Sequence, residues 1–122
     1  MTCKLLRGPT MIYEFKGKRP RIGKNVFIAP TATVIGDVEI GDHSSVWYNT
    51  VIRGDSDAIT IGKNTNVQDN CTIHVDEGKP AVIGDNVTIG HNAVVHGCKI
   101  EDNCLIGIHS TVLNDAHITK GS

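Results

Sequence analysis

Branched aliphatic residues recur at every sixth position along most of this chain, and no other feature of the sequence restricts the fold as strongly. The first six positions run without a slip, then come a three-residue and a four-residue insertion, and one later repeat is a residue short. An amphipathic α-helix needs apolar spacings of three and four, which this pattern does not supply. The sixteen repeated positions, here called the anchors, are Ile22, Ile28, Val34, Ile40, Val46, Ile52, Ile61, Val67, Ile73, Ile83, Ile89, Val95, Ile100, Ile106, Val112 and Ile118.

A strict six-residue period predicts an all-β fold, a single-stranded left-handed parallel β-helix built from hexapeptide repeats. Three hexapeptides make one triangular coil, each anchor points into the prism, and coils stack at the ~4.8 Å strand spacing. The narrow interior agrees with an aromatic content of only 4%. We expect one β-helix domain over residues 11–122, preceded by an unpatterned extension over residues 1–10.

Charge and apolar content argue against several classes of partner. The net charge is −1 and no run of like charges forms a tail, so we expect neither a nucleic-acid nor a membrane partner. No apolar run approaches the ~20 residues of a membrane-spanning helix, and the first residues lack the apolar core of a signal peptide. The four cysteines form no CxxC pair, which indicates reduced thiols and a cytoplasmic protein. Cys71 and Cys104 are interpreted as small buried side chains.

Three consecutive anchors return the chain to the same face one coil higher. On this basis Ile52, Ile73 and Val95 stack in one column, and the outward-pointing residues that follow them are Arg53, His74 and His96. Two imidazoles on neighbouring coils can share a metal ion, because zinc–nitrogen bonds are about 2.0–2.1 Å long. The repeat therefore predicts a metal site at His74 and His96.

A third histidine, His91, lies two residues past the anchor Ile89, near a corner of the preceding face. It should not reach a metal held by His74 and His96 of its own chain, but it could reach the metal of a neighbouring chain. A three-histidine site would then require a symmetric oligomer, and three-sided prisms suit a homotrimer. Three histidines with an open fourth position are typical of zinc sites that activate water, although cobalt or iron is also possible.

The remaining three histidines do not stack with another histidine in the repeat. His43, His109 and His117 are interpreted as solvated surface side chains.

Three motifs, VIRGD (51–55), NVQDNCTIH (66–74) and VTIGHNAVVHGC (87–98), closely resemble the γ-class carbonic anhydrases and their carbonic-anhydrase-like bacterial relatives. The motifs occur in order and in register with the anchors, and the resemblance covers roughly residues 11–118. It implies a homotrimer with zinc at the subunit interfaces, which hydrates carbon dioxide reversibly to bicarbonate by a metal-bound hydroxide. His74 and His96 would bind the metal from one subunit and His91 from the next.

The resemblance also implies roles for four other residues. Arg53 and Asp55 resemble the pair that forms an intersubunit salt bridge and shapes the site. Gln68 matches the glutamine that orients the hydroxide, and Asp69 resembles an acid that pairs with arginine across the interface. The repeat places Asp69 one coil below His91. A purely structural salt-bridge network of Arg53, Asp55 and Asp69 is an equal alternative.

The chain departs from the family pattern in four places. The long acidic loop after the first ligand is the short VDEGKP (75–80), in which Glu77 is the candidate proton shuttle; a solvated loop acid is the alternative. Ser56 replaces a second acid, and His109 stands where relatives tend to have a small residue and could disturb an upper coil or the edge of the pocket. The chain also stops soon after Ile118, so we expect a member without the further coils and C-terminal helix that relatives usually have.

Other functions fit the same fold. A hexapeptide acyltransferase would use one interfacial histidine without a metal, and the pair His74/His96 argues against it. A non-catalytic metal-binding or scaffold trimer fits the short loop and Ser56, and a thioester hydrolase fits an open zinc site.

Overall fold

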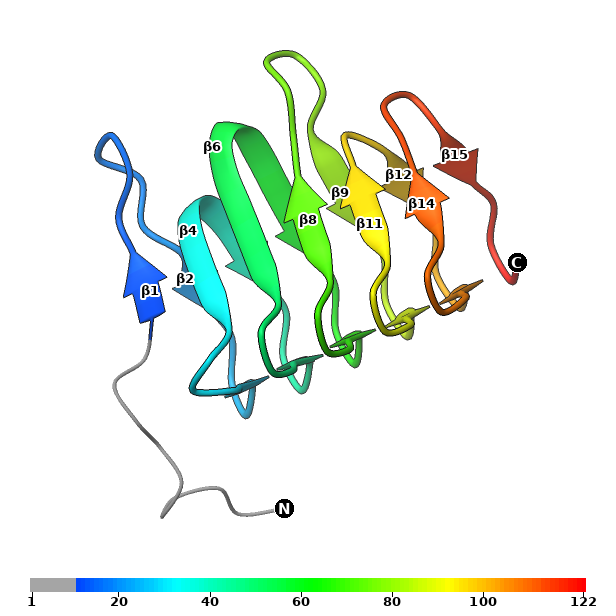
Figure 1. Ribbon diagram of the computed structural model, residues 1–122, viewed down its shortest axis with the longest axis horizontal. Helices are drawn as coiled ribbons and strands as arrows, with labels where there is room; N and C mark the ends of the chain where they lie inside the picture. The colour runs from blue at the N-terminus through cyan, green and yellow to red at the C-terminus, as the bar shows by residue number, and fades with distance from the viewer. Residues whose placement is uncertain (1–10) are drawn as a thin grey trace.

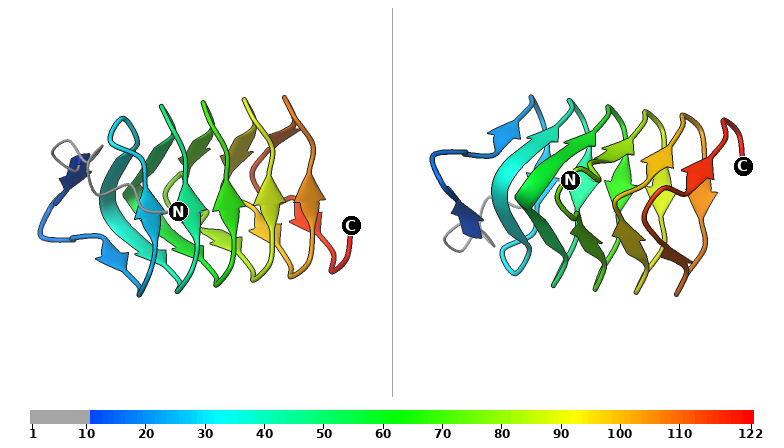
Figure 2. Two further views of the ribbon diagram at one scale, coloured as in Figure 1. Left: turned by 90° about the horizontal axis from the view of Figure 1, so that it is seen from below. Right: turned by 90° about the horizontal axis from the view of Figure 1, so that it is seen from above.

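The chain winds into a parallel β-helix of triangular cross-section, described over residues 11–122 in a computed structural model (Figure 1). The two views in Figure 2 show successive coils side by side along the long axis, from the N-terminal to the C-terminal end. All strand pairs between coils are parallel, and the described residues contain no helix. The prediction of an all-β, left-handed hexapeptide β-helix is confirmed.

Each coil contributes one segment to each of three faces. The first face, toward the viewer in Figure 1, carries β1 (Met11–Tyr13), the first parts of β4 (Thr33–Ile40) and β6 (Val51–Ile61), β8 (Thr72–His74), β11 (Val94–His96) and β14 (Thr111–Val112). The second face carries β2 (Arg21–Ile22), the remainders of β4 and β6, β9 (Ala81–Ile83), β12 (Lys99–Ile100) and β15 (His117–Ile118). The third face carries β3 (Phe27–Ile28), β5 (Ser45–Val46), β7 (Asn66–Val67), β10 (Thr88–Ile89) and β13 (Leu105–Ile106).

The anchors form the core, as the six-residue period predicts. Thirteen of the sixteen are buried, while Ile22, Ile28 and Ile118, at the ends of the repeat, are partly buried against them. Anchors of successive coils pair directly: Ile52 with Ile73, and Ile73 with Val95. The insertions fall between faces, so the columns stay in register across them.

Corners are turned by residues with left-handed backbone. One corner stacks four such residues, with φ of 64° at Asn49, 61° at Asn70, 60° at Asn92 and 65° at His109. Asparagine tolerates this conformation better than most residues. His109 continues the column: its amide donates to the His91 carbonyl at 2.8 Å and its side chain is exposed. The expectation that His109 could disturb an upper coil is therefore wrong.

Small polar side chains inside the prism link one coil to the next. The Thr50 hydroxyl donates to the Gln68 carbonyl at 2.6 Å, and Thr65 Oγ1 donates to the Gly84 carbonyl at 2.7 Å. Cys71 behaves in the same way, with Sγ donating to the Gly90 carbonyl at 3.1 Å. Cys71, Cys98 and Cys104 are free and buried, which confirms the interpretation of Cys71 and Cys104. Over residues 11–122 no helix is long and apolar enough to cross a membrane.

Candidate metal centre

The centre lies on the first face, where three strands end side by side. Arg53 on β6 pairs in register with His74 on β8, and His74 with His96 on β11. The column therefore stacks as the repeat arithmetic predicts. Each of the three follows a buried anchor, and alternation along a strand turns its side chain outward.

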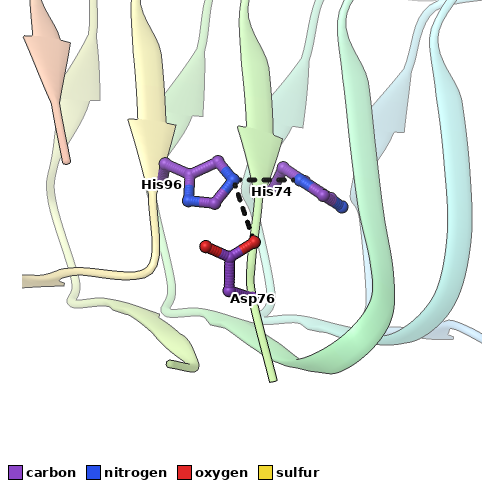
Figure 3. Close-up of side chains that lie close together, drawn as sticks. All are labelled: His74, Asp76 and His96. Atoms are coloured by element: carbon purple, nitrogen blue, oxygen red, sulfur yellow. Dashed lines mark hydrogen bonds and ion pairs between the residues drawn. The ribbon is translucent and has the colours of Figure 1, made fainter. Parts of the chain in front are cut away.

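The two imidazoles face each other across neighbouring coils (Figure 3). Nδ1 of His74 lies 3.0 Å from Nε2 of His96, and the rings meet edge to face with centroids 4.9 Å apart. Two nitrogens bound to one tetrahedral zinc ion at 2.0–2.1 Å would lie about 3.3 Å apart. The observed spacing is already close to that of two ligands sharing an ion.

The outer nitrogen of each ring is held by an acceptor. His74 Nε2 lies 2.9 Å from Asp55 Oδ1, and His96 Nδ1 lies 2.7 Å from Asn114 Oδ1. An ionised carboxylate only accepts hydrogen bonds, and so does an amide oxygen, so both outer nitrogens carry a proton. In the neutral rings, both inner nitrogens therefore direct lone pairs into the same space. This is the protonation pattern that a metal ion would require, and Asp55 and Asn114 set it.

Asp55 joins Arg53 to this arrangement. The two are separated by one residue on an extended strand, so their side chains point to the same side, and they form an ion pair. Burial on its own would raise the pKa of Asp55, but hydrogen bonds from His74 and Arg53 and the Arg53 charge outweigh it and lower the pKa to about 2. Asp55 is therefore ionised at neutral pH. Arg53 contacts Asp55 Oδ2, and the Ser56 hydroxyl lies 3.4 Å from Oδ1, the oxygen that His74 also contacts.

A carboxylate that the sequence analysis did not select completes the cluster. Asp76, in the short loop after β8, places Oδ1 4.0 Å from His96 Nε2 (Figure 3). Among the described residues, His74, Asp76 and His96 form a group whose ligand atoms all lie within 4.8 Å of one another. Glu77, the acid chosen from the sequence, is exposed and is not part of this group. The repeat cannot place a side chain in an insertion, which is why the sequence did not indicate Asp76. The prediction of Glu77 as a proton shuttle concerns a different role and stays a prediction.

Asn114 is a second residue of the centre that the sequence analysis did not indicate. It follows β14, and a signal was available, because the stacking of Val95 on Val112 places Asn114 directly above Gly97. A Cβ at Gly97 would collide with the Asn114 amide oxygen and lie 3.0 Å from its Cγ. The missing side chain at Gly97 leaves the space that the Asn114 amide occupies.

His91 lies at the corner between β10 and β11, apart from the other two histidines. It is five residues before His96, and an extended segment of that length spans up to ~16 Å. Its Nδ1 lies 3.3 Å from Asp69 Oδ1 on the coil below, as the repeat places them. Gln68 follows β7 on the third face, half-buried, near this same corner. His91 and Asp69 thus form a second pair at the other edge of the face, and Gln68 directly precedes Asp69 in the chain.

His43 and His117 are both exposed, as expected of surface histidines, but His117 also has a hydrogen-bond partner. His43 is an exposed corner residue with φ of 62°. His117 is exposed but hydrogen-bonded to Glu101, and this bond lowers the pKa of Glu101. Neither lies in the cluster of the centre.

A prism of stacked hexapeptides carrying a paired-histidine centre defines the class of protein. The family described as bacterial transferase hexapeptide (six repeats) matches residues 19–54 and 80–114, more than half of the chain, and the chain belongs to this family.

Curated relatives confirm the resemblance to carbonic anhydrases. A Methanocaldococcus jannaschii protein named "Probable carbonic anhydrase" is 60% identical over 75% of this chain and 57% of its own length. "Gamma carbonic anhydrase 2, mitochondrial" of Arabidopsis thaliana is 50% identical over 95% of this chain and 44% of its own length. The chain thus spans about half the length of these two relatives.

A solved Bacillus cereus structure, named as a candidate acetyltransferase, superposes on the same fold. It is 39% identical to this chain, with a TM-score of 0.86 over 94% of this chain and 74% of that one.

Proposed function

We propose that this protein catalyses the reversible hydration of carbon dioxide to bicarbonate with a zinc ion held between two copies of the chain. The observation that carries the proposal is the pair His74/His96, whose inner nitrogens converge at 3.0 Å while Asp55 and Asn114 hold the outer ones. Relatives named carbonic anhydrase support the reaction.

The donor set fits zinc, because neutral imidazoles are preferred zinc ligands and the inner nitrogens already lie at nearly the ligand spacing. Zinc, when bound, lowers the pKa of a coordinated water to about 7 and so supplies a nucleophile at neutral pH. His74 and His96 would hold the ion, while Asp55 and Asn114 keep their rings oriented. Cobalt or iron would also suit imidazole ligands.

His91 is the proposed third ligand, donated by a second copy of the chain. Its position at the far edge of the face, next to Asp69, favours a site between copies over one within a chain. A homotrimer of prisms would supply three equivalent sites. Gln68, near the same corner, would approach the site together with His91 and is proposed to orient the attacking oxygen.

The polar residues around the pair have proposed supporting roles. Arg53 is 45% exposed, so its guanidinium could pair with Asp69 of a neighbouring copy while still contacting Asp55. Such contacts would shape the site and hold the copies together, which unites the functional and the structural interpretations of these residues. Glu77 is an exposed loop acid, proposed as proton acceptor together with external buffer.

Stopped-flow hydration of carbon dioxide with zinc-loaded protein tests the proposal. We expect a rate well above that of buffer, and loss of this excess in His74→Ala and His91→Ala. His43→Ala, which removes an exposed corner histidine, serves as the matched control and should keep the rate. No excess rate in zinc-loaded protein, or an unchanged rate in His74→Ala, would refute the proposal.

Acyl transfer is the second candidate, favoured by the acetyltransferase name of the Bacillus cereus neighbour. It leaves the convergent histidine pair and its carboxylate unexplained. Turnover of acetyl-CoA with amine acceptors, insensitive to chelator, would favour it. One zinc ion per chain without either activity would instead indicate a metal-binding scaffold.

A further inference from the structure

The loop that carries Asp76 is fixed at both sides. Its turn closes through a hydrogen bond from the Lys79 amide to the Asp76 carbonyl at 2.9 Å, with Gly78 in the left-handed region at φ of 75°. From the coil below, Asp57 Oδ2 accepts the Gly78 amide at 2.9 Å. On the other side, Lys79 Nζ forms an ion pair with Asp115 at 2.7 Å. Asp76 therefore projects from a short turn tied to two neighbouring coils.

A single amide connects Asp76 to the histidine pair. Asn114 Nδ2 donates to Asp76 Oδ2 at 2.8 Å, while Asn114 Oδ1 accepts from His96 Nδ1 at 2.7 Å. Gly97 leaves the space in which this amide lies. Asn114 thereby orients His96 and Asp76 at once, and it leaves Asp76 Oδ1 on the side of the inner nitrogens, 4.0 Å from His96 Nε2.

We propose that Asp76 is a third metal ligand from the same chain, so that His74, His96 and Asp76 form a complete site for a divalent first-row metal ion without a second copy. Two imidazoles and one carboxylate are a known ligand set for such ions and leave positions open. The ligand atoms lie within 4.8 Å of one another, about 1–1.5 Å wider than in a closed tetrahedral site. Binding would draw the exposed Asp76 carboxylate toward the two histidines by about that distance.

This site extends the metal centre of the proposed function and shares its two histidines, but it does not require carbon dioxide as substrate. In a single chain, Asp76 takes the third position that His91 of another copy would take in a trimer. Metal binding would then precede assembly, whereas a purely three-histidine site would need assembly first.

Metal binding by His91→Ala tests the proposal, because this variant keeps only the ligands of one chain. We expect one Co²⁺ per chain by elemental analysis, with the visible absorption of histidine-bound Co²⁺ and a dissociation constant from chelator competition. The solution mass is measured on the same samples. Failure of His91→Ala to bind more metal than His74→Ala would overturn the proposal.

Removal of the carboxylate is the decisive second step. In the His91→Ala background, Asp76→Ala should weaken Co²⁺ binding at least about 10-fold and change the visible spectrum. Glu101→Ala in the same background removes an exposed carboxylate outside the centre and should change neither. Equal affinity and an unchanged spectrum in the Asp76 variant would overturn the proposal.

Substitution of Asn114 provides a second test of the site, which is needed if Asp76→Ala changes the conformation of the loop. Asn114→Ala removes the amide that orients both ligands and should weaken Co²⁺ binding about 10- to 100-fold in the His91→Ala background. Unfolding midpoints of all variants establish that they fold.

Metal in His91→Ala without hydration by the unaltered protein would refute only the proposed function. Hydration by the unaltered protein with metal-free His91→Ala would refute only this inference.

Discussion

Asp55 Oδ1 lies 2.9 Å from Nε2 of His74, and the same carboxylate forms an ion pair with Arg53. The carboxylate therefore fixes the orientation of the imidazole, and the guanidinium helps to keep the carboxylate ionised. This pattern, in which an acid fixes the protonated nitrogen of a metal-binding histidine, is common around zinc.

Substitution of Asp55 should therefore act through His74. We expect Asp55→Ala to weaken zinc binding about 10- to 100-fold, because His74 loses the acceptor that fixes its ring. Chelator competition measures the dissociation constant. Asp37→Ala, which removes an ion pair with Arg21 away from the centre, is the control and should leave zinc affinity unchanged. Equal affinities in the two variants would show that Asp55 does not position His74.

Truncation of the anchor beneath the centre should be costly. Ile73 is fully buried between Ile52 and Val95, so Ile73→Ala should lower the free energy of unfolding by about 2–5 kcal/mol. Urea denaturation monitored by circular dichroism measures this. Val82→Ala, at a residue 41% exposed, should change stability by less than about 0.5 kcal/mol. A loss at Ile73 no larger than that at Val82 would contradict the stacked-anchor core.

Gly54 permits the close approach of two coils beside Arg53 and Asp55. A Cβ at Gly54 would lie 2.5 Å from the Asp37 carbonyl oxygen, which belongs to the backbone and cannot easily move away. Gly54→Ala should lower the free energy of unfolding by about 1–3 kcal/mol, measured by urea denaturation. Gly107→Ala is the control, since its nearest neighbour would be Ser110 Oγ at an ordinary 3.4 Å. A Gly54 variant as stable as the Gly107 variant would argue against this packing.

The buried cysteines should resist modification in the folded protein. Burial raises the pKa of Cys71 and Cys98, so less thiolate is present at pH 8 than for an exposed cysteine. Because Cys3 lies outside the described residues, the experiment uses Cys3→Ser. Folded protein should react slowly with a disulfide reagent, and three thiols should react promptly in urea. Prompt reaction of the folded protein would contradict the burial of these side chains.

The spacing of the repeats was sufficient to predict the fold and the stacked column of Arg53, His74 and His96 in the centre. The anchors and the column of Arg53, His74 and His96 follow from the sequence because each coil uses three hexapeptides and insertions fall between faces. The same arithmetic placed Asp69 beneath His91. In a repeat with a fixed period, the number of residues between two positions determines whether they stack. These contacts could therefore be predicted without knowing the side-chain conformations.

Only the tertiary structure decided how the rest of the centre is built. The turn after β8 lies outside the repeat, so the position of Asp76 beside the two histidines depends on how that turn is tied to the neighbouring coils. Asn114 acts through the direction of its amide over Gly97, which spacing does not determine. The sequence by itself determined which coils bring the two histidines together, because stacking follows the period. The three-dimensional packing of loops decided which carboxylate faces them, because insertions have no period to follow.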